Sequence, residues 1–306
     1  MSKISNITYL VGSENFETKP FKPYNKITCD FLIEFSKKLN LHKDTNKISD
    51  LKALAFWCRK QNIANLAKKG LSEEERVGLG LIFHITHSNI ATNFIYSLFF
   101  GLLTGNSNVV KISSKKTIQS EIICKCLNQI LRQKKFKKLK KRVVIVRYEN
   151  NDNFTKNISN ECDLRIIWGG DNSIKSIRKF EIKPSSTDIT FSDRSSICVI
   201  NSHSIIKLDS FNISILVEKF YNDTYLVDQN ACSSPHIVFW QGSRDENKIA
   251  QKKFWDQLYF LVKKKYNLEE NSAIDKYTIL CKKINLLKNN CKFIEYENLI
   301  YILKIK

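Results

Sequence analysis

The stretch Leu79–Thr86 reads LGLIFHIT, and this nearly continuous apolar run is typical of a β-strand that is buried on both faces. Three further strand patterns follow it: NVVKI at 108–112, RVVIVRY at 142–148 and LRIIW at 164–168. Helical patterns lie between or after these runs, at Ile90–Leu103, Thr117–Lys134 and Ser173–Phe180. Strands that alternate with helices of this length predict βαβ units on a parallel sheet.

The alternation continues on both sides of this block. A helical pattern at Lys52–Lys68 precedes it, within an N-terminal region that is otherwise polar and mixed. After Ser195 the patterns are a strand at 196–201 (SICVIN), a helix at Asn212–Tyr221, a strand at His236–Trp240 and an amphipathic helix at Phe254–Lys265. We therefore expect an α/β protein.

Composition narrows the classes of function. The chain has 306 residues, of which 42% are hydrophobic, and this excludes wholesale disorder. The formal net charge of +20 favours anionic partners, although Lys, Asn and Ile dominate together in the way that codon bias would produce. We interpret the basic run Lys134–Arg142 (KKFKKLKKR) as a solvated helix end and turn, and we expect no nucleic-acid partner.

The nine cysteines have irregular spacing and include no C-x-x-C pair, which predicts free thiols in a reducing, cytoplasmic compartment. The five histidines are scattered, so we expect no metal site. The N-terminus lacks the unbroken apolar stretch of a signal peptide. The most apolar window, Ile90–Leu103, is too short to span a bilayer, so we expect a soluble protein with no membrane insertion.

Candidate functional residues gather in loops after the predicted strands, where open α/β sheets bind their ligands. These loops are 85–89 (ITHSN), 105–113 (GNSNVVKIS) and 168–170 (WGG). A fourth segment, DQNACSSP at 228–235, places a cysteine among small and polar residues just before a strand. Gly78-x-Gly80 does not complete a dinucleotide fingerprint, because Phe83 stands where the third glycine belongs and the pair opens a strand.

Four segments in this order resemble the acyl-CoA reductase family of the bacterial luminescence systems, the LuxC type, a branch of the aldehyde dehydrogenase superfamily. HITHSN at 84–89 resembles the superfamily's I-T-P-W-N element, and LLTGNSNVVKIS at 102–113 resembles G-N-x-V-V-x-K-P-S. IWGGDNSI at 167–174 stands where F-T-G-S-x-x-V-G stands, and DQNACSSP resembles the segment around the nucleophile. The resemblance covers roughly residues 70–242.

The resemblance implies a chemistry for these residues. Cys232 as thiolate would attack an acyl thioester and expel CoA, and NADPH or NADH would then reduce the enzyme-bound thioester to an aldehyde. The side-chain amide of Asn89 and the backbone N–H of Cys232 would stabilise the oxyanion. Lys111 would contact the cofactor ribose or its phosphate, and Gly169 and Gly170 would let the pyrophosphate approach the backbone. Further cofactor-loop candidates are Thr86, Ser88 and Ser113.

The absence of a carboxylate base fits reduction. A dehydrogenase needs a base to activate water, yet residues 190–195 (TFSDRS) contain no E-L-G-G, and Asp193 beside Arg194 is more consistent with an ion pair. The group that activates Cys232 stays open, with His203 and His236 as distant candidates. Two alternative functions also stay open: an aldehyde dehydrogenase, or a degenerate paralogue that acts as an acyl carrier or partner subunit.

The resemblance also implies an organisation. We expect an aldehyde-dehydrogenase-like fold with an N-terminal mostly helical or mixed region at 1–70, an NAD(P)-binding α/β domain at 71–194 and a catalytic α/β region at 195–306. The chain ends at Lys306, soon after Cys232, so we expect a shortened C-terminal part. The expected partners are an acyl-CoA or acyl-protein thioester, an acyl-activating enzyme and further copies of the chain in a homo-oligomer.

Overall fold

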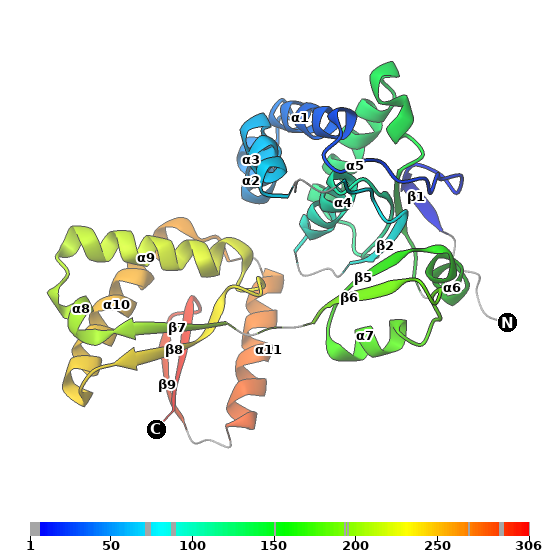
Figure 1. Ribbon diagram of the computed structural model, residues 1–306. Helices are drawn as coiled ribbons and strands as arrows, with labels where there is room; N and C mark the ends of the chain where they lie inside the picture. The colour runs from blue at the N-terminus through cyan, green and yellow to red at the C-terminus, as the bar shows by residue number, and fades with distance from the viewer. Residues whose placement is uncertain are drawn as a thin grey trace. The chain divides into compact units, whose positions relative to one another are not determined.

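The computed structural model describes residues 7–70, 75–86, 90–149, 151–192, 194, 196–268, 270–287 and 291–305. The chain divides into two compact units, residues 1–193 and 194–306. The first unit contains a six-stranded sheet in the order β1-β4-β3-β2-β5-β6 (Figure 1). Its strands are β1 Thr8–Val11, β2 Leu81–Ile85, β3 Ser107–Ile112, β4 Val143–Arg147, β5 Leu164–Trp168 and β6 Thr187–Phe191.

The strands from β4 to β6 are parallel, and β1 adds an antiparallel edge against β4. The chain runs outward from β2 through β3 to β4, and then returns to β5 on the other side of β2. The strand order therefore reverses between β2 and β5, which is where open α/β sheets bind ligands at the carboxyl ends of their strands.

Alternation along the strands explains why helices cover both faces of this sheet. Val110 and Ile112 belong to the core beneath α1–α5, whereas Val109 belongs to the core on the opposite face beneath α6 and α7. All residues of β2 are buried, as the apolar run at 79–86 predicts. The helices of the two faces are α1 Lys26–Asn40, α2 Ser49–Trp57, α3 Lys60–Gly70, α4 Asn93–Leu103 and α5 Ile118–Leu131, then α6 Asp152–Glu161 and α7 Asp171–Ile177.

The second unit has a core of its own. The parallel pair β7 Ser196–Asn201 and β8 Pro235–Gln241 packs one face against helices α8 Ser202–Lys207, α9 Ser210–Thr224 and α10 Arg244–Lys265. Helix α11 Glu270–Leu286 leads to the antiparallel hairpin of β9 Cys291–Tyr296 and β10 Ile300–Ile305. In the described part of the chain, no helix is both long enough and apolar enough to cross a membrane.

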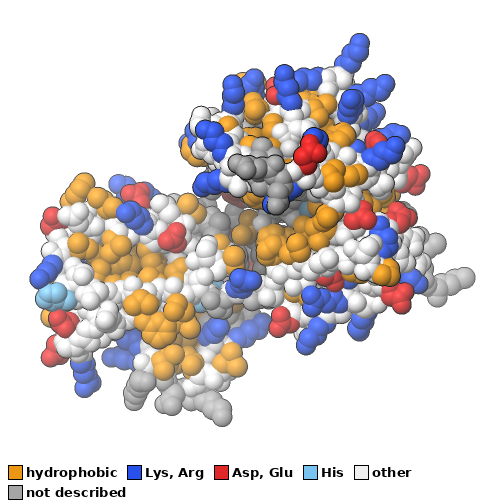
Figure 2. Space-filling model, in the orientation of Figure 1, with side chains coloured by type: hydrophobic (Ala, Val, Ile, Leu, Met, Phe, Trp, Pro, Cys, Tyr) orange, Lys and Arg blue, Asp and Glu red, His pale blue; other side chains and the backbone are white. Residues whose placement is uncertain are grey.

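The other face of the β7–β8 pair is apolar and exposed. Alternate residues Ile197, Val199, Ile237 and Phe239 are 58%, 62%, 46% and 52% exposed. Figure 2 shows hydrophobic side chains gathered on the face of the second unit over α9, β7 and β8. A parallel sheet with one solvent-facing side is unusual, because parallel strands are normally covered on both faces.

One predicted element is wrong. The pattern at Lys52–Lys68 predicts a single helix, but the structure has α2 and α3 with a break at Cys58 and Arg59. Side chains satisfy the carbonyls at the end of α2: Asn62 Nδ2 donates to the Trp57 carbonyl (2.7 Å) and Arg59 Nε donates to the Phe56 carbonyl (2.9 Å). Such local hydrogen bonds compete with helix continuation.

Candidate functional site

A depression lies at the carboxyl ends of β2 and β3, on the face that α4 and α5 cover. Two predicted cofactor residues, Thr86 after β2 and Ser113 after β3, both line it. The depression is small and partly open to solvent. The rest of its lining combines polar groups and apolar side chains: Lys115, Thr117 and Ser120, then Ile90, Ala91, Phe94 and Ile112.

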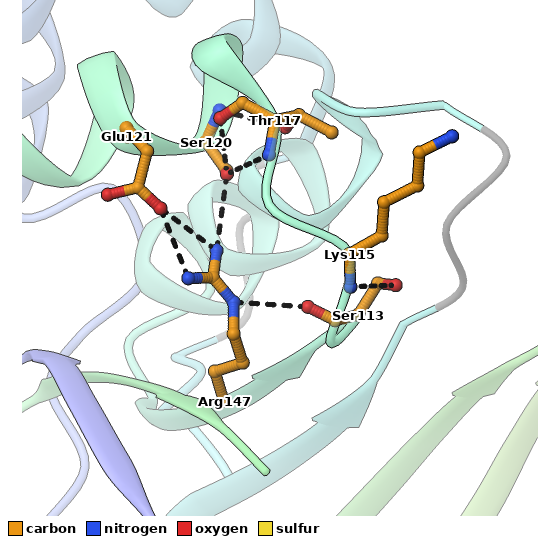
Figure 3. A network of polar contacts seen from close by, with 6 residues as sticks. All are labelled: Ser113, Lys115, Thr117, Ser120, Glu121 and Arg147. Atoms are coloured by element: carbon orange, nitrogen blue, oxygen red, sulfur yellow. Dashed lines mark hydrogen bonds and ion pairs between the residues drawn. The ribbon is translucent and has the colours of Figure 1, made fainter. Parts of the chain in front are cut away.

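Arg147 at the end of β4 fixes the polar wall of this depression (Figure 3). Its Nε donates to the Ser113 carbonyl (3.2 Å), and its two terminal nitrogens donate to Glu121 Oε1 (3.1 Å each). One of these nitrogens also lies 3.4 Å from Ser120 Oγ. Because the guanidinium side chain is only 10% exposed, the geometry of these charged hydrogen bonds holds the segment 113–121 in place.

The N-terminus of α5 faces the same depression. Thr117 caps the helix in a capping box with Ser120, and the Lys115 amide donates to Ser113 Oγ (3.2 Å). Helix N-termini favour anions, since their first N–H groups point outward with partial positive charge. Sequence reasoning missed Arg147 here. The available signal was a charged residue in the apolar run RVVIVRY, the same signal that singled out Lys111.

Lys111 lies apart from the lining of the depression. It alternates with Ile112, so its side chain leaves the sheet on the opposite face, where its Nζ lies 5.5 Å from the centroid of the Tyr148 ring. Burial lowers the pKa of Lys111, and the nearby Glu149 carboxylate opposes that shift. The Lys111 carbonyl accepts hydrogen bonds from the amide and the hydroxyl of Thr86, at 3.1 and 3.0 Å.

Gly169 and Gly170 follow β5, the strand beside β2. The Gly169 amide donates to the Phe191 carbonyl (3.2 Å) and so continues the pairing of β5 with β6. Gly170 is the N-cap of α7. The indole of the preceding Trp168 stacks on the Phe191 ring with centroids 4.0 Å apart, and its Nε1 donates to Ser97 Oγ (3.3 Å).

Cys232 lies in the second unit, on the loop between α9 and β8, and it is exposed. Asp228 and Gln229 begin this loop with positive φ angles of 49° and 58°, a left-handed conformation that costs energy for residues other than glycine. Gln229 forms hydrogen bonds to residues on both sides of the loop. Its amide donates to the Thr224 carbonyl (2.7 Å), and its Nε2 donates to the Pro235 carbonyl (2.8 Å).

Two serines fix the backbone nearer to Cys232. Ser196 Oγ donates to the Cys232 carbonyl (2.6 Å), and Ser234 Oγ donates to the Asp223 carbonyl (2.5 Å). No hydrogen bond joins the Cys232 amide or sulfur to a described residue, and the residue is exposed. Neither candidate histidine contacts Cys232 among the described interactions: His203 pairs with Glu246 (3.3 Å), and burial lowers the pKa of His236.

Three predicted positions, Ser88, Asn89 and Asp193, lie outside the described residues. The structure therefore brings together Thr86 and Ser113, with Lys111 joined to Thr86 through its backbone. It places Gly169 and Gly170 on the neighbouring strand end. Cys232 belongs to the second unit.

The architecture is that of the aldehyde dehydrogenases. A benzaldehyde dehydrogenase of Corynebacterium glutamicum is 12% identical with a TM-score of 0.60, over 99% of this chain and 79% of that chain. An aldehyde dehydrogenase of Pseudomonas aeruginosa is also 12% identical, with a TM-score of 0.61 over 90% of this chain and 61% of that chain. At this identity the likeness shows the fold alone, and it confirms the aldehyde-dehydrogenase-like fold that the sequence predicts.

Within that class, the family model of acyl-CoA reductase (LuxC) matches residues 24–268, and the chain belongs to this family. It is 23% identical over 226 residues to long-chain acyl-protein thioester reductase 2 of Photobacterium leiognathi, covering 71% of this chain and 42% of that protein. The corresponding reductase of Aliivibrio fischeri is 23% identical over 166 residues, covering 53% of this chain and 32% of that protein. Each match spans less than half of the curated relative's length.

Proposed function

We propose that this chain reduces a long-chain acyl thioester, either acyl-CoA or an acyl-protein thioester, to an aldehyde through a thioester on Cys232. The observation that carries the proposal is an exposed thiol on a loop whose backbone is held by Gln229, Ser196 and Ser234. The DQNACSSP segment of a LuxC-family chain contains this thiol. The relatives named above are reductases of long-chain acyl-protein thioesters, which supports the choice of substrate.

We propose that the phosphate-bearing part of a nicotinamide cofactor binds at the depression of the first unit. Its polar wall at Ser113, Thr117 and Ser120 suits ribose and phosphate oxygens, and Lys115 adds a positive charge. When bound, the reduced nicotinamide supplies a hydride. We propose NADPH, with NADH as the alternative, and we retain Lys111, Ser88, Gly169 and Gly170 as further cofactor residues.

The chain's own residues perform the acyl transfer. The Cys232 thiolate attacks the carbonyl carbon of the thioester, and the electron pair moves to the oxygen. The Cys232 amide, which donates to no described residue, would hydrogen-bond this oxyanion together with the side-chain amide of Asn89. Collapse of the adduct expels the thiolate of CoA or of the acyl carrier and leaves an acyl group on Cys232. After reduction, the Cys232 thiolate departs and the aldehyde is released.

From the family we further propose that the protein is cytoplasmic, that it forms a homo-oligomer, and that it receives its acyl group from an activating partner enzyme. No carboxylate base for water is needed, because hydride rather than water attacks the carbonyl carbon of the acyl-enzyme.

The test is intact-protein mass spectrometry after incubation with a long-chain acyl-CoA, with and without NADPH. We expect an adduct of acyl mass on the wild type, no adduct on Cys232→Ala, and loss of the adduct when NADPH is added. Cys281→Ala removes another exposed thiol and is the matched control that keeps the adduct. An adduct that survives both NADPH and NADH would favour an acyl carrier, and no adduct would contradict the proposed nucleophile.

A further inference from the structure

The loop that contains Cys232 is held from outside by the end of α10. Tyr266, the residue that caps α10, donates its hydroxyl to Asp228 Oδ1 (2.5 Å). Asp228 is the first of the two left-handed residues that open the loop, so this hydrogen bond acts at the strained entry. Burial raises the pKa of Tyr266, and the hydrogen bond to the Asp228 carboxylate raises it further. The phenol therefore stays protonated and remains a donor.

Tyr266 is itself anchored by an aromatic neighbour. Its ring packs edge-on against Tyr225, with centroids 5.1 Å apart and planes at 73°. The Tyr225 hydroxyl donates to the Leu299 carbonyl (3.0 Å) in the turn between β9 and β10. The Tyr225 ring also stacks on Tyr221 of α9, with centroids 5.4 Å apart. One rigid aromatic group thus joins the end of α9, the end of α10 and the C-terminal hairpin.

Lys276 of α11 completes the anchor. Its half-buried ammonium donates to the carbonyls of Leu299 and Asn298, and it lies 5.9 Å from the Tyr225 ring centroid and 5.4 Å from that of Tyr301. Burial lowers its pKa to about 8, and the Asp228 carboxylate opposes that shift. Asp228 thus accepts a hydrogen bond from a phenol and lies near the positive charge of Lys276.

We propose that Tyr266 is a positioning residue for Cys232, acting through its hydrogen bond to Asp228. The proposal rests on the proposed function of Cys232 as the nucleophile. Only three residues separate Asp228 from Cys232, and Gln229 and Ser196 fix the backbone between and beyond them. A restraint at Asp228 therefore determines where the thiol and the Cys232 amide lie when the thioester arrives. Without it, the loop samples more conformations and the productive one is less populated.

The variant that tests this is Tyr266→Phe, which removes the hydroxyl and keeps the ring against Tyr225. Tyr296→Phe is the matched control, because the Tyr296 hydroxyl donates to a carboxylate of the same unit, Asp256 (3.0 Å), away from the loop. Both variants lose one phenol–carboxylate hydrogen bond, so we expect similar losses of thermal stability. A difference between them at the Cys232 loop then reports positioning rather than stability.

Two measurements on the full chain decide the proposal. Amide exchange of a peptide covering residues 226–234 should be about tenfold faster in Tyr266→Phe, since a hydrogen bond to a charged group is worth roughly that factor. The rate constant for acylation of Cys232 at saturating acyl-CoA should fall by a similar factor, with little change in the half-saturating concentration. Asp228→Asn keeps an acceptor oxygen and tolerates the left-handed backbone, so it should lose less than Tyr266→Phe.

The outcomes separate cleanly. If Tyr266→Phe matches Tyr296→Phe in loop exchange and in acylation rate, Tyr266 is an ordinary packing residue and the proposal is wrong. If wild-type Cys232 is not acylated at all, the proposed function fails, and loop exchange together with site-resolved alkylation of Cys232 by iodoacetamide still decides whether Tyr266 orders the loop.

Discussion

The imidazole of His84 lies in the interior of the first unit with both ring nitrogens hydrogen-bonded. Asn108 donates its amide to the Asn106 carbonyl, so its Oδ1 faces His84 Nε2 (2.9 Å) and requires a proton there. His84 Nδ1 then accepts the hydroxyl of Ser97 (2.7 Å), and Ser97 Oγ also accepts the Trp168 indole N–H. In this neutral tautomer both ring nitrogens of His84 are hydrogen-bonded, and the network joins β2, β3, α4 and the end of β5.

Burial lowers the pKa of His84 from 6.5 to about 4. The unfolded chain therefore binds more protons than the folded chain between these values, and stability falls as the pH decreases through that window. We expect His84 to account for a loss of about 2 kcal/mol between pH 7 and pH 5. Denaturant unfolding of the wild type and His84→Gln at both pH values measures this. The variant is the less stable protein at pH 7, and the gap should shrink at pH 5. A gap independent of pH would contradict a neutral, buried His84.

At the scale of elements, the turn between α4 and β3 depends on Gly105. This residue has φ +88°, and a Cβ there would lie 2.2 Å from the Phe21 carbonyl oxygen. Phe21 pairs with it, because the Phe21 amide donates to the Gly105 carbonyl (2.7 Å). We expect Gly105→Ala to lower the free energy of unfolding by about 2 kcal/mol or more, from left-handed strain and from displacement of the backbone at Phe21.

Gly169→Ala is the control for that measurement. Its φ of +159° is also unfavourable for a residue with a side chain, but a Cβ there would meet only the Ser173 side chain, at 3.3 Å, and no backbone atom. Chemical denaturation should therefore show a smaller loss for Gly169→Ala than for Gly105→Ala, because Gly169→Ala lacks the clash with backbone. Equal losses in the two variants would mean that the turn at Gly105 tolerates a side chain.

In the first unit, the sequence could predict the strands that are buried on both faces, but not the strands that are partly exposed. Strands β2, β4 and β5 are apolar runs buried on both faces, so composition alone locates them. Strand β6 alternates exposed and half-buried residues, and the edge strand β1 has only four residues, so neither forms such a run. Helix α11 and the hairpin β9–β10 escaped prediction because Lys and Asn interrupt their apolar pattern.

The candidate site could be predicted in part, because the parallel arrangement of the strands follows from the sequence pattern. Parallel strands end at one edge, so the residues after β2 and β3 meet there, and Thr86 and Ser113 line one depression. The charge in an apolar run marks Arg147, but its role could not be assigned, since its partners Ser113 and Glu121 depend on the path of a loop. Tyr266 could not be assigned either. Its partner Asp228 is distant in sequence, and only the packing of α10 against α9 brings the two together.

At the scale of the whole molecule, each unit has its own hydrophobic core. We expect calorimetry to resolve two unfolding transitions, since each unit has a core cluster of its own. Trp57 and Trp168 report on the first unit, and Trp240 and Trp255 report on the second. NADPH at about 100 times its Kd should stabilise the first unit by roughly 2.7 kcal/mol and raise that transition by a few degrees. A single transition that involves all four tryptophans would contradict this division.

The apolar outer side of the β7–β8 pair has a practical consequence for anyone handling the protein. Dyes that fluoresce when they bind apolar surfaces should bind to the folded protein at Ile197, Val199, Ile237 and Phe239. In a dye-based thermal unfolding assay the fluorescence would then be high before unfolding, and its increase on heating would be small. The same apolar face should promote self-association at high protein concentration. Added salt should increase this self-association, because it screens the repulsion among molecules of net charge +20.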